Sequence, residues 1–172
     1  KYGTDLANLP RIQLTTPGSF GAANVGLDME VILSQWEDTL GIKVEIQQTD
    51  WPTFLQDLQR RRFQMFDIGW IADYPDPENF LDILFHSTSS SNHTNYNNAE
   101  VDGLLETARL GGNQEKRYAT YRQVEQKLIY DAPWVPLWHS GEGHVLVKPY
   151  VKNYYLPPLV IPKLRHVYFE KQ

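Results

Sequence analysis

The chain has 172 residues, of which 41% are hydrophobic and 22% are charged, and its formal net charge is −5. This composition is typical of a single globular domain, and the negative charge argues against nucleic acid as a partner, because phosphates repel an acidic surface. The chain lacks cysteine, which excludes disulfides, a catalytic thiol and thiolate metal sites, and its apolar runs are too short to span a membrane.

Strands are predicted for three segments of the first half. Residues 11–15 and 42–46 alternate between polar and apolar side chains, and residues 65–71 form a mainly apolar run. We expect the third segment to be a buried strand. Pro75 and Pro77 prevent it from continuing, because proline fixes φ and has no backbone N–H.

Two helices are predicted between these strands. The first has Asn24 as its N-cap and ends at Gly41, a residue that readily adopts the left-handed conformation of a helix end. The second has Asp50 as its N-cap, because an aspartate side chain can accept a hydrogen bond from the first turn. Trp36 and Trp51 lie at positions expected to face inward, so both are predicted to be core residues.

The second half is predicted to be mainly helical at first. Helices are expected over 78–85, 100–110 and 115–131, where apolar residues recur at helical spacing. Residues 87–98 are expected to form a polar loop that is too hydrophilic to pack.

Strands and extended chain are predicted after the last helix. Residues 134–139 and 144–147 are expected to form two strands joined as a hairpin. From Pro149 onward, repeated prolines favour an extended, non-helical tail.

The turn after the third strand gathers Asp73, Asp76 and Glu78. Paired carboxylates can hydrolyse glycosides, so a hydrolase is one alternative. Acidic residues in a proline-rich turn more often cap the next helix, which is the expectation for Asp76 or Glu78. Asp73 comes three residues after Trp70. A carboxylate beside an aromatic wall suits a ligand ammonium group with an apolar side chain attached.

Neither a metal nor a cofactor is predicted. His139 and His144 superficially resemble a zinc motif, but they lack the helical spacing that places two histidines on one face. The sequence contains no Gly-x-Ser-x-Gly elbow, no cofactor loop and no nucleophile paired with a base. We therefore expect a non-catalytic protein.

A longer resemblance is centred on residues 70–80, whose sequence is WIADYPDPENF. This segment resembles the second lobe of the oligopeptide and dipeptide family of extracytoplasmic solute-binding proteins, which serve ABC importers. Further segments occur in the family's order, namely LGIKVEI at 40–46, NYNN at 95–98 and APWVPLW at 132–138. The resemblance implies an α/β (α+β) fold, with a mixed sheet flanked by helices as the second lobe of a two-lobe protein.

The resemblance also implies a ligand site. Asp73 matches the aspartate that receives the ligand's α-amino group in peptide-binding members, and Trp70, Ile71, Tyr74 and Thr16 are expected to line the same site. In the dipeptide-selective branch, an arginine after the first strand receives the peptide's carboxylate. The loop that contains Thr16 has no arginine, which favours a longer peptide or another solute.

Domain boundaries and partners follow from the same resemblance. Residues 1–148 are expected to form the second lobe, and residues 149–172 to return to a first lobe that lies outside this sequence. The implied partners are a peptide or similar solute and the permease of an ABC importer, in an extracytoplasmic location. An isolated lobe could self-associate through its apolar surface, so a protein-interaction module is a further alternative.

Overall fold

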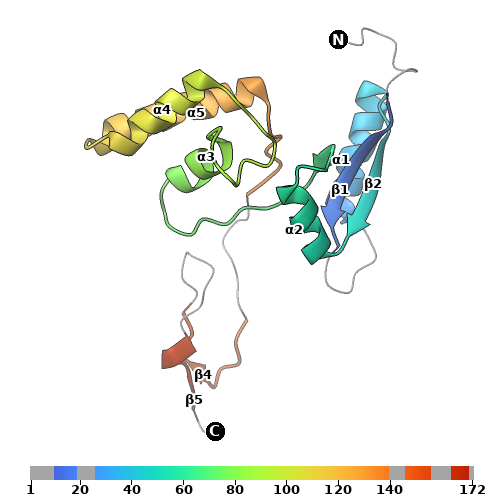
Figure 1. The fold of residues 1–172 in the computed structure, drawn as a ribbon. Coiled ribbons are helices and arrows are strands. Elements are labelled where there is room, and N and C mark those ends of the chain that lie inside the picture. Colours follow the sequence, from blue (N-terminus) through green and yellow to red (C-terminus); the bar gives the residue numbers. More distant parts are fainter. Residues whose placement is uncertain (1–9, 19–25, 140–145, 156–163, 171–172) are drawn as a thin grey trace. The chain divides into compact units, whose positions relative to one another are not determined.

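The chain divides into two units, Lys1–Gly69 and Trp70–Gln172. The computed structural model describes residues 10–18, 26–139, 146–155 and 164–170 (Figure 1). Strands and helices both occur in the described residues, which confirms the predicted α/β class. None of the helices described is both long and apolar enough to cross a membrane.

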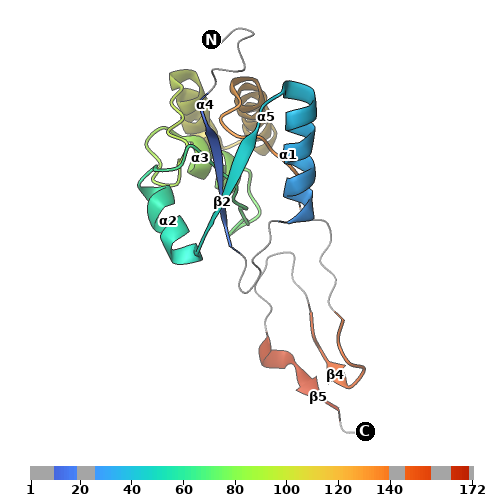
Figure 2. The ribbon, with the colours of Figure 1, turned by 90° about the vertical axis from the view of Figure 1, so that its right-hand side faces the viewer.

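The first unit contains a three-stranded sheet with β1 (Ile12–Pro17) at its centre. β1 pairs in parallel with β2 (Val44–Thr49) on one side and with β3 (Met65–Phe66) on the other. The strands are parallel because α1 (Leu27–Leu40) and α2 (Trp51–Gln59) provide the long connections that parallel pairing requires. The connection through α1 runs from β1 to β2, and the connection through α2 runs back across β1 to β3. Because both connections are right-handed and run in opposite directions, α1 and α2 lie on opposite faces of the sheet, as Figure 2 shows.

The ends of these helices largely follow the predicted signals. Gly41 ends α1 in the left-handed conformation with φ 65°, and the carboxylate of Asp50 accepts the N–H of Thr53 at 3.1 Å at the start of α2. The predicted cap Asn24 lies outside the described residues, and α1 follows Gly26. β2 begins and ends later than predicted, because it pairs along the whole length of β1.

Aromatic residues form one part of the core of the first unit. Phe54 is fully buried and stacks on Phe63, with ring centroids 5.0 Å apart. The prediction that Trp51 is a core residue is wrong, because its side chain is 43% exposed. Trp51 is the first residue of α2, and its ring stacks on the ring of Phe54, with ring centroids 5.9 Å apart. Trp36 is half-buried.

The second unit is built on three helices. α3 (Glu78–Phe85) has the predicted bounds, and α4 (Ala99–Leu110) and α5 (Gln114–Asp131) begin one residue earlier than predicted. α4 and α5 lie side by side, joined by a short turn (Figure 1). At the opposite end of the pair, Asn98 caps α4 and also donates to the carboxylate of Asp131 at 2.9 Å. The buried core of this unit comprises Leu84, Phe85, Val101, Leu105, Ala108, Tyr121, Val124 and Leu128.

The hairpin predicted after α5 is not found in the described residues. Residues 134–139 form no strand, because Pro136 removes a backbone donor from the middle of the segment. Residues 146–147 also form no strand, and positions 144 and 145 lie outside the described part of the chain. The antiparallel pairing occurs instead in the tail, where β4 (Val151–Lys152) pairs with β5 (Tyr168–Phe169). A short 3-10 helix, η2 (Leu164–His166), precedes β5.

Candidate functional site

The strand that leads to the acidic turn is shorter than predicted. β3 ends at Phe66 rather than at Ile71, although the N–H of Asp67 still donates to the carbonyl of Thr15 at 3.1 Å. The next bond of a parallel ladder would need an N–H from Pro17, and proline has none. The chain therefore leaves the sheet here, and Ile71 is 62% exposed instead of buried.

Asn79, in the first turn of α3, organises the segment that follows. Its side chain is fully buried. Its Oδ1 accepts the indole N–H of Trp70 at 2.9 Å and the backbone N–H of Asp73 at 3.3 Å. One oxygen atom thus connects the aromatic residue and the acidic residue that the sequence predicts for the site.

Arg117, on α5, holds the other end of the turn. Its guanidinium forms two hydrogen bonds to the carboxylate of Asp76, at 2.6 and 2.7 Å, and its Nε donates to the carbonyl of Ala108 at 3.1 Å. Asp76 also accepts the N–H of Glu78, the first residue of α3, at 2.9 Å, although the N-cap position itself is occupied by Pro77. The hydrogen bonds from Arg117 lower the pKa of Asp76.

The Arg117–Asp76 pair should make the stability of the fold depend on pH. Because the folded-state pKa of Asp76 lies below its ordinary value of 3.8, the pair stabilises the fold above that value, and this is lost as the pH falls through the folded pKa. We expect Arg117→Met to lose about 1.5–3 kcal/mol near neutral pH, since hydrogen bonds to charged groups contribute roughly this much. Urea unfolding of both proteins should show this difference shrinking in acid, and a constant difference would contradict the ion pair.

The three carboxylates of the turn have different surroundings. Glu78 accepts a hydrogen bond from the hydroxyl of Tyr74, which raises the pKa of Tyr74, and Asp76 is held by Arg117. Among the described residues, the exposed carboxylate of Asp73 has neither a hydrogen-bond partner nor an ion-pair partner. Asp73 is therefore the carboxylate available to an external cation.

Four of the five predicted site residues lie in one stretch of chain. Trp70 is half-buried and packs against the core of the second unit, whereas Ile71, Asp73 and Tyr74 are exposed. Thr16 belongs to the first unit. It is the penultimate residue of β1, at the carboxyl end of the parallel sheet, and it is only 8% exposed.

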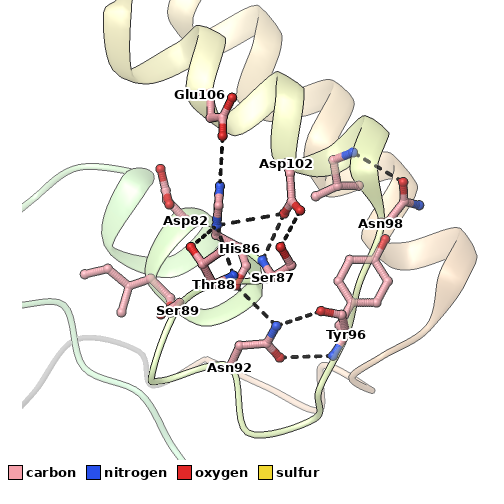
Figure 3. A network of polar contacts seen from close by, with 12 residues as sticks. Asp82, His86, Ser87, Thr88, Ser89, Asn92, Tyr96, Asn98, Asp102 and Glu106 are labelled. Atoms are coloured by element: carbon pink, nitrogen blue, oxygen red, sulfur yellow. Dashed lines mark hydrogen bonds and ion pairs between the residues drawn. The ribbon is translucent and has the colours of Figure 1, made fainter.

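The loop between α3 and α4 corrects the prediction for residues 87–98. Asn92 is fully buried, and its amide donates to the carbonyl of Tyr96 at 2.8 Å and accepts the N–H of Tyr96 at 3.1 Å (Figure 3). Ser87 donates through its N–H and its hydroxyl to Asp102, at 2.9 and 2.5 Å. The polar side chains satisfy the loop's backbone, so the loop packs despite its hydrophilic composition.

This arrangement fits binding better than hydrolysis. A glycosidase needs two carboxylates that both face the substrate, and here Asp76 and Glu78 are engaged within the protein while Asp73 is not. Within the described ranges, no group of three or more His, Cys, Asp or Glu residues is placed to hold a metal ion. The site offers an exposed carboxylate with aromatic and aliphatic surface beside it.

Asn79 and Arg117 are absent from the residues predicted for the site. For Asn79 a signal exists, because Asn79 and Asp82 share the inward face of α3 with apolar neighbours. A polar side chain at a buried helix position requires a partner. For Arg117 there is no local signal, because its partner Asp76 is distant in the sequence.

Comparison with known proteins shows the family to which this chain is similar. Residues 6–92 match the family model of the bacterial extracellular solute-binding proteins, family 5, middle region. The periplasmic murein peptide-binding protein MppA of Escherichia coli is 32% identical over 123 residues, which is 72% of this chain and 22% of MppA. The heme-binding protein A of Haemophilus influenzae is 32% identical over 159 residues, which is 91% of this chain and 28% of that protein.

Solved structures share the fold. A structure of E. coli MppA aligns with a TM-score of 0.83 and 28% identity, covering 94% of this chain and 31% of that one. The H. influenzae OppA complex with the peptide RPPGFSPFR aligns with a TM-score of 0.79 and 27% identity, covering 98% and 33%. The chain thus spans no more than a third of the length of these proteins.

Proposed function

Because this chain belongs to the bacterial extracellular solute-binding proteins of family 5, we propose that it is part of a two-lobed protein that captures peptides outside the cytoplasm for an ABC importer. Relatives named as peptide-binding proteins support this proposal, as does the relative whose structure contains a bound peptide. The family consists of substrate-binding transport proteins, and we propose the same non-catalytic role for this chain.

The observation that carries the proposal is the unpaired, exposed carboxylate of Asp73, which lies in the same stretch of chain as the exposed Ile71 and Tyr74. A free peptide presents an α-ammonium group and its first side chain on the same Cα atom. Asp73 would receive the ammonium, while Trp70, Ile71 and Tyr74 would contact the adjoining side chain. An ion pair of this kind becomes strong when water is removed from it, which closure of the first lobe over the site would achieve.

Thr16, in the first unit, is proposed separately as a residue that contacts the ligand. Ligands of parallel α/β sheets bind beyond the carboxyl ends of the strands, and Thr16 lies next to that edge of its sheet. The described part of the loop after β1 contains no arginine for a dipeptide's carboxylate. We therefore propose peptides longer than two residues as the ligand class.

The decisive test is to purify the full-length protein and identify by mass spectrometry what it carries. We expect short peptides with free amino termini, released on unfolding in a one-to-one ratio with protein. A parallel incubation with peptide and glycoside panels separates the alternatives. Turnover of either panel without saturable, stoichiometric binding would rule out the binding role and favour the hydrolase.

The tail provides a separate prediction. We propose that residues 149–172 return to the first lobe, because Tyr155, Leu164 and Phe169 are 69%, 58% and 73% exposed. The 172-residue chain alone is expected to self-associate through this apolar surface, and sedimentation velocity over a concentration series would measure it. A monomer at every concentration, with tail amides that exchange as slowly as those of β2, would instead assign the tail to the second lobe.

A further inference from the structure

We propose that Asn79 is a positioning residue, which fixes Asp73 and Trp70 relative to each other and thereby sets the preference of the site for a free amino group. Asn79 itself does not contact the ligand, because its side chain is fully buried. The inference rests on the proposed function, since it requires that Asp73 receives a ligand ammonium.

The geometry assigns this role to a single atom. The Oδ1 of Asn79 accepts the Trp70 indole N–H at 2.9 Å and the Asp73 backbone N–H at 3.3 Å. The first bond fixes the orientation of the aromatic wall, and the second fixes the backbone that carries the carboxylate. Binding groups must be held to within roughly 0.5 Å of their productive geometry, so a shared anchor of this kind determines how well the two act together.

The burial of Asn79 is difficult to explain by stability alone. Within the described residues its Nδ2 is buried and forms no hydrogen bond, which is unfavourable for an amide. An apolar side chain at this inward position of α3 would avoid that penalty. An apolar side chain could not accept hydrogen bonds from the Trp70 indole N–H and the Asp73 backbone N–H. The acceptor oxygen therefore explains why an asparagine occupies this position.

The remainder of the turn is anchored independently of the Asn79 side-chain oxygen. Asp76 is fixed by Arg117 and by the N–H of Glu78. Between this anchor and Trp70, the backbone N–H of Asp73 has Asn79 as its partner, while the Asp73 side chain is exposed. Loss of the Asn79 oxygen should therefore release Asp73 without unfolding the turn.

Asn92 offers a matched control for a substitution at Asn79. Both are fully buried asparagines in the second unit, and both bond to backbone groups. Asn92 bonds to Tyr96, to Thr94 and to the carbonyl of His86, and these three residues lie outside the 70–79 segment. Asn79→Ala and Asn92→Ala thus both remove a fully buried amide, but Asn79→Ala also removes the acceptor that Trp70 and Asp73 share.

The experiment uses the full-length protein and two probes, a pool of random tri-, tetra- and pentapeptides and the same pool N-acetylated. The measured quantity is the ratio of affinities for the free and the acetylated pool, which general destabilisation does not change. We expect the ratio to fall by about tenfold or more in Asn79→Ala, equivalent to about 1.4 kcal/mol, and to stay unchanged in Asn92→Ala. Asn79→Asp should retain the ratio, because it keeps the acceptor oxygen and a carboxylate is favourable at a helix N-terminus.

Each other result has a distinct meaning. An unchanged ratio in Asn79→Ala, or an equal fall in Asn79→Ala and Asn92→Ala, would overturn the positioning role. Loss of the ratio in Asn79→Asp would overturn it as well, even if Asn79→Ala failed to fold. A wild-type protein that does not distinguish the two pools would overturn the proposed function of Asp73 before any variant is considered.

Discussion

Replacing Asp73 by alanine in the full-length protein is expected to weaken peptide binding by about 2–5 kcal/mol, the usual result of removing one partner from a buried charge pair. The ligand's ammonium group would be enclosed without a counter-charge once the lobes close. Isothermal titration calorimetry with peptides recovered from the purified protein would measure the loss, and the dissociation rate should account for most of it.

Two controls make the result for Asp73 specific. Glu125→Ala changes the net charge by the same amount at an exposed position of α5 and should leave affinity unchanged. N-acetylated peptides should bind the wild-type protein as weakly as free peptides bind Asp73→Ala. Equal affinity of the wild type for free and acetylated peptides would remove the amino-capture role from Asp73.

The second large effect is expected from Arg109, which pairs with Asp82 through two hydrogen bonds. The side chain of Asp82 is only 4% exposed, whereas that of Arg109 is 46% exposed. Arg109→Met should destabilise the second unit by about 3–5 kcal/mol, because it leaves a buried carboxylate without its partner. Asp82→Asn should be milder, because the arginine left behind can reach water.

Chemical denaturation of the two variants would test this asymmetry. Arg122→Met removes an exposed arginine from α5 and is expected to stay within about 0.5 kcal/mol of the wild type. If Arg109→Met and Asp82→Asn lowered the free energy of unfolding equally, the burial of Asp82 would not be the origin of the effect.

Local signals explain which parts of the fold could be predicted. The end of α1 depends on Gly41, and the start of α2 depends on Asp50, each within one turn of the helix concerned. The bounds of α3 follow from the two prolines before it and from its apolar spacing. Asp73 and Trp70 are predicted for the site from their chemistry, their close spacing and the family resemblance of residues 70–80.

The predictions that failed depend on contacts between distant residues. The end of β3 is set by Pro17, which belongs to another strand and cannot supply the next hydrogen bond. Residues 87–98 were expected to be solvated because they are polar, but Asn92 and Asp102 provide partners within the fold. The helical pattern marks Asn79 as a polar residue that needs a partner, but it does not identify Trp70 and Asp73 as the partners, because these hydrogen bonds depend on the folded path of the turn.

Asp131 gives the α4–α5 pair a property that neither helix has alone. Asp131 is the last residue of α5, and its carboxylate accepts hydrogen bonds from the side-chain amide of Asn98 at 2.9 Å and from the hydroxyl of Tyr96 at 2.5 Å. Burial, together with the hydrogen bond to Asp131, raises the pKa of Tyr96 to about 12. The helical hairpin is thus closed at both ends, so the last turn of α5 cannot fray without also opening the start of α4. Residues 96–131 should therefore exchange and unfold as one cooperative segment. Because its contacts are local in sequence, this segment should also be among the first parts of the second unit to form during folding.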